Sequence, residues 1–394
     1  MAERSAESLQ SALKPVPADV IRRFAGGTLI LEHERQHYVG LDLLRGVAAY
    51  GVILAHLHVA ISRGVGFNVE PIITGFLGRA GVEVFFAPSG FLIGGILCDL
   101  RERTAANYGI FLVRRWMRTL PLYYVAVWFF FAYPDIFEPR TPHKLWQYLT
   151  FTQNFTGQRD LTWFNVSWTL AVEEWFYALL TVSVAFATLT LRLKNGFVCA
   201  VAFLIVLGIT IRAASPMWGG LGVIGRLDAI AYGCLLAWLV RHPVIGPRLY
   251  GKRALVCVAA VLGIYATWIM ERYGVLYWSR FNLVFHYVLW GVTAAGVVYA
   301  FYLWRPTSPA LVRVAAFAAA VSYPIYIWHQ AVMWIFWQSR VNESLGLLHA
   351  ALVILLASAI AYAMHIAIEQ PFMAWRPRFR TNAKPVPQAV AVAQ

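Results

Sequence analysis

Ionisable side chains inside long apolar segments are the residues of this sequence best suited to chemistry. A charge is costly to bury in hydrocarbon, so such residues usually mark a functional site. The segment LDLLRGVAAYGVILAHLH places Arg45 and His56 eleven residues apart. On a helix this spacing puts both side chains on one face, about 16 Å apart along the axis, with His58 on roughly the opposite face. His56 is therefore a candidate general base; the ordinary alternative is a hydrogen bond that packs two helices together.

Two adjacent carboxylates, Glu173 and Glu174, lie several residues into the apolar segment NVSWTLAVEEWFYALL. Adjacent helical residues point about 100° apart, so the two carboxylates cannot both face one partner. One is expected to face a polar interior, where it would pair with an arginine, hold a catalytic proton or orient the His56 imidazole. The structural alternative is an ion network that includes Arg226 or Asp228. We treat both carboxylates as candidate catalytic residues.

Three arginines form a cationic cluster in the segment FLVRRWMRTLPLYY. Arg115 and Arg118 are three residues apart and share a helix face, and Arg114 lies beside them. Guanidinium groups match phosphate oxygens, so the cluster is a candidate phosphate site. The alternative is an ordinary basic anchor at the cytoplasmic boundary.

Four further residues are candidates for substrate binding, and each is weak when taken alone. Ser167 and Trp168 lie near the outer end of their apolar segment, where an aromatic face would stack on a sugar. Asp228 follows a glycine and an arginine in GRLDAIAYG, and His329 lies within SYPIYIWHQ. The four cysteines are far apart, so their spacing predicts neither a metal site nor a disulfide framework.

The composition shows what kind of element must position these residues. Only 13% of the residues are charged and 60% are hydrophobic, whereas soluble domains carry about 25% charged residues. Such a chain cannot cover its surface in water, so it is expected to lie in a lipid membrane. The formal charge of +14 is spread over many short loops, which argues against a nucleic-acid partner.

The apolar segments predict an all-α protein of about ten membrane-spanning helices. They are residues 41–61, 81–98, 119–137, 167–190, 196–214, 222–240, 254–270, 282–302, 315–337 and 346–369. With the N-terminus inside, the predicted inner segments hold 23 of the 33 lysines and arginines. This bias predicts that both termini are cytoplasmic.

The predicted organisation has a membrane domain at 41–371 between two cytoplasmic ends. Residues 1–40 contain no signal-peptide pattern, so the first span is expected to act as an uncleaved insertion signal. Residues 372–394 are basic and then rich in alanine, valine and proline, which is typical of disorder. The outer loop at 138–166 is expected to form a lid over an outward-facing site.

The order of these motifs resembles that of the acyltransferase family 3 membrane proteins. The matching pieces are LDLLRGVAA with the arginine–histidine spacing, GVEVFFAPSGFLIGGIL, FLVRRWMRTLPLYY, SWTLAVEEWFY, GRLDAIAYG, SYPIYIWH and IEQP. They run in the family's order from about residue 41 to residue 371. The chain departs from the family at FFAPSG, where Pro88 replaces a residue that is usually leucine.

The resemblance implies a bacterial inner-membrane enzyme that transfers an acyl group, by expectation acetyl, from cytoplasmic acyl-CoA. The acceptor would be a hydroxyl of an extracytoplasmic carbohydrate, and the enzyme would act either alone or with separate polysaccharide-assembly proteins. The resemblance implies that Arg45 and His56 match the family's functional pair, in which His56 would either deprotonate the acceptor hydroxyl or briefly carry the acyl group. Arg115 and Arg118 would match its arginine pair, with Arg45 and Arg114 also holding the coenzyme. No metal is expected. The alternatives are a transporter of a small solute or acylated product, and an inactive scaffold of an export complex.

Overall fold

The computed structural model describes residues 38–69, 73–133, 144–155, 163–214, 222–275, 279–338 and 346–379. Both predicted tails lie largely outside these residues, as does much of the predicted lid. The described part is helical with connecting turns and contains no strand, which confirms the predicted all-α class. The helices are α3 (Val39–His56), α4 (His58–Val65), η1 (Ile73–Gly78), α6 (Arg79–Cys98), α7 (Ala105–Ala132), α8 (Leu145–Leu149), α9 (Ser167–Ala185), η2 (Phe186–Thr190), α10 (Gly196–Ala214), η4 (Ile224–Arg226), α11 (Leu227–Arg241), α12 (Ile245–Gly251), α13 (Arg253–Arg272), α14 (Arg280–Leu303), α15 (Pro309–Gln338), α16 (Leu347–Met364), η7 (His365–Glu369) and α17 (Gln370–Ala374).

Within the described ranges, eight helices are long and apolar enough to cross a membrane. The count rises to nine if the pair 224–241 and 245–251, which is bent by 97°, forms one broken span. Helix α7 has 28 residues and is not among them; it contains three arginines, and charged residues oppose insertion into lipid. The chain is therefore a multi-pass membrane protein, while the count of ten and the orientation of the termini stay predictions.

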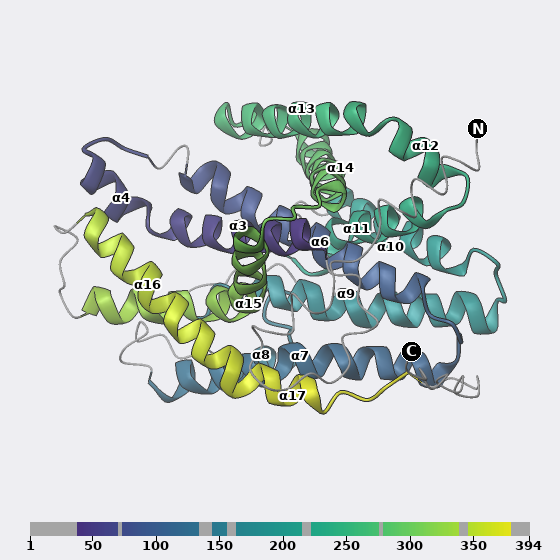
Figure 1. The fold of residues 1–394 in the computed structure, drawn as a ribbon, viewed down its shortest axis with the longest axis horizontal. Coiled ribbons are helices and arrows are strands. Elements are labelled where there is room, and N and C mark those ends of the chain that lie inside the picture. The colour runs from purple at the N-terminus through teal and green to yellow at the C-terminus, as the bar shows by residue number, and fades with distance from the viewer. Residues whose placement is uncertain are drawn as a thin grey trace, which may run out of the picture.

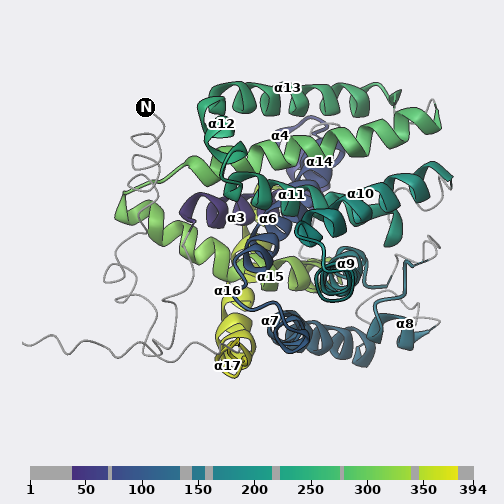
Figure 2. The same cartoon turned by 90° about the vertical axis from the view of Figure 1, so that its right-hand side faces the viewer.

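Helices α3, α6 and α11 occupy the middle of the molecule, and the other long helices surround them (Figure 1). Helix α6 packs against α3, α11 and α14, and α3 packs against α15. Helices α7 and α9 form the lower part of the bundle in Figure 1, opposite α13. Figure 2 shows α13 and α7 again at opposite edges. The first predicted span therefore lies at the centre, where Arg45 of α3 is buried.

Two helices differ from their predicted spans in ways that affect the site. The predicted span 41–61 is broken, because α3 ends at His56 and Leu57 has the non-helical angles φ −91° and ψ 9°. The predicted span 119–137 belongs to a longer helix that begins at Ala105, where the Thr104 side chain accepts a hydrogen bond from the Asn107 amide. The arginine cluster therefore lies within α7, and His56 lies at a helix end.

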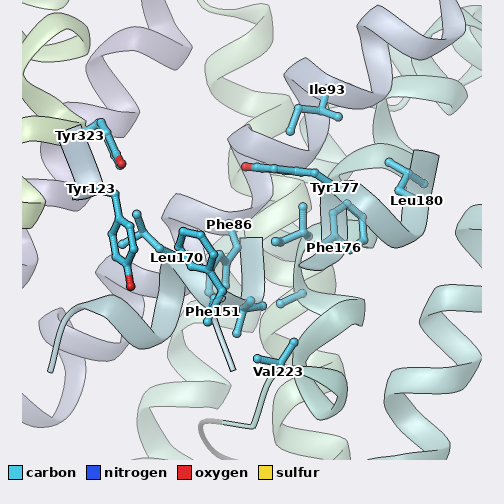
Figure 3. Packing of buried hydrophobic residues seen from close by; sticks show 14 of the residues in the cluster. Phe86, Ile93, Tyr123, Phe151, Leu170, Phe176, Tyr177, Leu180, Val223 and Tyr323 are labelled. Atoms are coloured by element: carbon cyan, nitrogen blue, oxygen red, sulfur yellow. The ribbon is translucent and has the colours of Figure 1, made fainter. Parts of the chain in front are cut away.

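The largest hydrophobic cluster among the described residues contains many aromatic residues from α7, α9 and the turns between them. Tyr123 stacks on Phe151 with ring centroids 4.4 Å apart, and Phe130 stacks on Phe164 at 4.5 Å. Figure 3 shows Tyr123 and Phe151 beside Leu170 of α9. Trp163, which lies in the predicted outer loop 138–166, is only 2% exposed and belongs to this core.

Helices α6 and α11 approach so closely that only glycine fits at their contact. A Cβ added to Gly90 would lie 2.0 Å from the Ile230 carbonyl oxygen, and one added to Gly233 would lie 2.1 Å from the Ala87 carbonyl oxygen. Both atoms belong to backbone, which cannot move aside cheaply. Small residues at such contacts are typical of membrane helix pairs.

We expect Gly233→Ala to lower the free energy of unfolding in detergent by about 1–3 kcal/mol, because the methyl group overpacks the contact. The matched control is Gly109→Ala in α7, where nothing lies within 4 Å of an added Cβ. Removing this helical glycine is expected to stabilise α7 by about 0.5–1 kcal/mol. Equal effects of the two substitutions on thermal unfolding would contradict the close contact.

Candidate active site

His56 forms a hydrogen-bonded pair with His329, which the sequence had suggested only as a substrate-binding residue. His56 Nδ1 lies 3.1 Å from His329 Nε2, and the rings stack with centroids 5.1 Å apart. His329 is fully buried in α15, and its Nδ1 lies 3.1 Å from the Ile325 carbonyl oxygen. The pair joins α3 to α15 at the level where α3 ends.

The contacts of His329 assign the tautomer of both neutral rings. A carbonyl oxygen only accepts, so His329 Nδ1 must donate to Ile325, and His329 Nε2 is then an acceptor. His56 Nδ1 therefore donates to His329 Nε2, which leaves His56 Nε2 as the unprotonated nitrogen. This is the arrangement that a general base needs, with one nitrogen fixed and the other able to take a proton.

His56 also lines a cavity of about 200 Å³. Most of the residues that line the cavity are apolar. Besides His56, the lining residues that can form hydrogen bonds are Trp168, Tyr326 and Asn165. Tyr326 is fixed by the Thr169 hydroxyl, which donates to it at 2.9 Å. A small ligand in this space would therefore meet a basic nitrogen, an aromatic face and a positioned phenol.

A second polar group lies deeper in the bundle, between α7 and α9. Arg115 donates from Nη2 to the Tyr177 hydroxyl at 2.5 Å and lies 3.4 Å from Glu173 Oε2. Glu174 accepts a 2.7 Å hydrogen bond from the Thr119 hydroxyl. The two carboxylates thus have different partners on one helix, as the 100° separation predicted, and both are buried.

Helix rise places this second group below the cavity. Glu174 follows Trp168 by six residues on α9, which is about 9 Å along the axis. On α15, Tyr323 precedes His329 by the same six residues, and its hydroxyl donates at 2.6 Å to the carbonyl of Thr119. Figure 3 shows the hydroxyls of Tyr177 and Tyr323 pointing into the same interior region.

Arg45 connects the two groups along α3. It is 7% exposed and lies over the Phe85 ring at 5.8 Å. Asp42, Arg115 and Glu173 all interact with it electrostatically. The structure therefore brings Arg45, Arg115 and both carboxylates into one buried network, about 16 Å from His56 at its far end.

The remaining predicted site residues lie elsewhere. Arg114 donates to the Pro377 carbonyl at 2.6 Å and lies over the Phe379 ring, so it faces the C-terminal segment, whereas Arg115 faces α9. Arg118 is half-buried on α7. Ser167 is buried and donates to the Phe164 carbonyl at 2.6 Å. Asp228 is buried in an ion pair with Arg212; neither Ser167 nor Asp228 lines the cavity.

Three of the polar residues in these groups were not predicted from the sequence. Tyr177 follows the two glutamates by three or four residues, so helical spacing would have placed it on their side. Tyr326 precedes His329 by three residues, so helical spacing would likewise have placed it on the same face as His329. Thr119 carries no such signal, because a lone threonine in an apolar helix usually bonds its own backbone.

The chain belongs to acyltransferase family 3, whose model, described as an acyltransferase domain, matches residues 38–366. Among curated relatives, SACOL0978 of Staphylococcus aureus (strain COL) is 28% identical over 229 residues, which cover 53% of this chain and 36% of the relative. The O-acetyltransferase OatA of Staphylococcus aureus (strain NCTC 8325 / PS 47) is 25% identical over 221 residues, which cover 51% of this chain and 34% of the relative. The matches thus span about a third of each relative's length. No solved structure matches the chain.

Proposed function

We propose that this protein is an O-acyltransferase of the bacterial inner membrane that moves an acetyl group from cytoplasmic acetyl-CoA to a hydroxyl of an extracytoplasmic carbohydrate. The observation that carries the proposal is the His56–His329 pair, whose free nitrogen belongs to a residue that lines a small cavity. The family membership of the chain and the name of its relative OatA support the same reaction. The proposal includes a lipid membrane and polysaccharide-assembly proteins as partners, and no metal.

In the proposed reaction, His56 Nε2 takes the proton of the acceptor hydroxyl. The acceptor oxygen then forms a bond to the thioester carbonyl carbon, and the carbon–sulfur bond breaks. The thiolate leaves and receives the proton from His56, so the histidine returns to its starting state. The limited cavity volume favours a short acyl group, and the aromatic face of Trp168 would stack on a sugar ring.

His329 would act in this reaction as a positioning residue that keeps His56 in the required tautomer. We expect His329→Phe to lower kcat about tenfold with KM nearly unchanged, because one neutral hydrogen bond is lost. His329→Gln offers an amide oxygen that can still accept from His56 and should retain more activity than His329→Phe. Steady-state kinetics would check this order; equal losses in both variants would contradict the positioning role.

The proposed function is tested with purified protein in detergent and radiolabelled acetyl-CoA. A bacterial cell-envelope glycan fraction serves as the acceptor, and the product is the label that becomes attached to glycan. Transfer that requires intact protein and increases with glycan would support the proposal. Coenzyme A binding is measured in parallel by calorimetry. No transfer together with no binding would contradict the enzyme and favour a transporter of a small solute or acylated product.

A further inference from the structure

We propose that the buried network of Arg45, Arg115, Glu173 and Glu174 recognises the pantetheine arm of coenzyme A through the arm's amide and hydroxyl groups. The sequence suggests phosphate binding as the role of these arginines, but in this proposal the network does not hold the phosphates. This inference rests on the proposed acyl-CoA donor. It concerns the segment of the donor between the reacting thioester and the nucleotide.

The charges of the network argue against a phosphate site. Arg45 interacts with Asp42 and Glu173, and Arg115 interacts with both Glu173 and Glu174. Whether or not Glu174 is ionised, two positive charges face at least two negative ones, so the network has no net positive charge. A phosphate brought into this buried region would meet carboxylates that repel it, and low polarity strengthens that repulsion. A neutral ligand carries no such penalty.

The network contains buried polar atoms that a neutral ligand would satisfy. Within the part of the chain that the structure describes, the Nε atoms of Arg45 and Arg115 have no hydrogen-bond partner. Glu173 Oε1 and Glu174 Oε2 have no close hydrogen-bond donor among the described residues, although each carboxylate has a further hydrogen-bond interaction, Glu174 with the Trp116 side chain and Glu173 with the Tyr177 hydroxyl. Buried polar groups are nearly always paired, so unpaired ones call for an explanation.

These atoms match the functional groups of pantetheine. Each amide of the arm offers one N–H donor and one carbonyl acceptor, and the arm also carries a hydroxyl. The carboxylate oxygens would accept from the N–H groups, and the guanidinium Nε–H groups would donate to the carbonyls. Two donors and two acceptors in one network are suited to a chain of amides, whereas a phosphate needs donors alone.

The spacing agrees with the length of the arm. In an extended arm the two amide nitrogens lie roughly 4 and 9 Å from the sulfur. Glu173 and Glu174 lie about 8–9 Å along the axis of α9 from Trp168, which lines the cavity together with His56. Arg45, about 16 Å from His56 along α3, would meet the hydroxyl end of the arm. A thioester in the cavity therefore places its second amide beside Glu173 and Glu174.

The test compares parts of the coenzyme by competition against radiolabelled coenzyme A in the full-length protein. The competitors are pantetheine, which lacks the phosphates, and adenosine 3′,5′-bisphosphate, which lacks the arm. We expect Glu174→Gln to weaken the binding of coenzyme A and of pantetheine by the same factor, about tenfold to a hundredfold, because the pantetheine amide N–H loses its charged acceptor. The affinity for adenosine 3′,5′-bisphosphate should not change.

The matched control is Glu271→Gln, which alters a buried glutamate that pairs with Arg79 far from α7 and α9. It should leave all three affinities unchanged. Two results for Glu174→Gln would overturn the inference. One is a lower affinity for adenosine 3′,5′-bisphosphate alone, and the other is a lower affinity for coenzyme A with an unchanged affinity for pantetheine. Unchanged binding of all three ligands would overturn it as well. If the wild-type protein binds no coenzyme A, the result would instead contradict acyl-CoA as the donor in the proposed function.

Discussion

Replacing His56 by alanine is expected to lower kcat for acyl transfer by about 10²- to 10⁴-fold while the protein stays folded and still binds coenzyme A. The reason is specific to this site. His56 carries the free imidazole nitrogen of the pair that lines the cavity, and alanine offers no atom that can take the acceptor proton. His329 is not expected to substitute, because it is fully buried and does not line the cavity.

Label transfer from acetyl-CoA to glycan, measured with wild type and His56→Ala side by side, checks this expectation. His58→Ala is the matched control, since His58 is two residues away and its Nδ1 lies 2.9 Å from the Ala55 carbonyl oxygen. It should retain near-wild-type transfer. Equal transfer by wild type and His56→Ala would keep the enzyme class but remove His56 from the mechanism, and Glu173 and Glu174 would become the next candidates for the base.

The sequence predicts this part of the site well because helical spacing is a reliable rule. The eleven-residue spacing of Arg45 and His56 predicts one shared face, and the structure has Arg45 buried and His56 lining the cavity. The 100° separation of Glu173 and Glu174 likewise gives them different partners. Such arguments hold because they concern one helix, whose geometry is the same wherever the helix packs.

The partners across helices could not be predicted, because spacing within one helix contains no information on which helix lies opposite. His56 and His329 are separated by 273 positions, and no rule of periodicity pairs α3 with α15. The ends of α3 and α7 were also missed. Hydropathy detects an apolar segment, but a break at Leu57 or a cap at Thr104 depends on local backbone angles and hydrogen bonds.

The largest expected effect on stability comes from two ion pairs, one that joins α6 to η4 and one that joins α10 to α11. Arg226 pairs with Glu83, and Arg212 pairs with Asp228, with every side chain at most 3% exposed. Tyr287 lies over both guanidinium groups, at 4.2 Å from Arg226 and 5.1 Å from Arg212. Glu83 follows Val82, which lines the cavity, so this pair also supports one wall of the site.

Glu83→Gln is expected to lower the free energy of unfolding by about 3–5 kcal/mol, because it removes the direct partner of the buried Arg226 and leaves Asp228 as the one carboxylate beside two arginines. The matched control is Asp99→Asn, since Asp99 pairs with Arg241 but its side chain is 62% exposed. That exposed pair should contribute less than about 1 kcal/mol. Denaturant titration in detergent measures both changes.

The double substitution Glu83→Met with Arg226→Leu separates the cost of an unpaired charge from the cost of altered packing. Replacing both members by apolar residues of similar volume leaves only the paired charges of Arg212 and Asp228, so we expect most of the lost stability to return. If the double variant were as unstable as Glu83→Gln, the pair would be stabilising in its own right. The Glu83–Arg226 contact would then hold α6 in place against η4. The cavity wall that contains Val82 would depend directly on this contact.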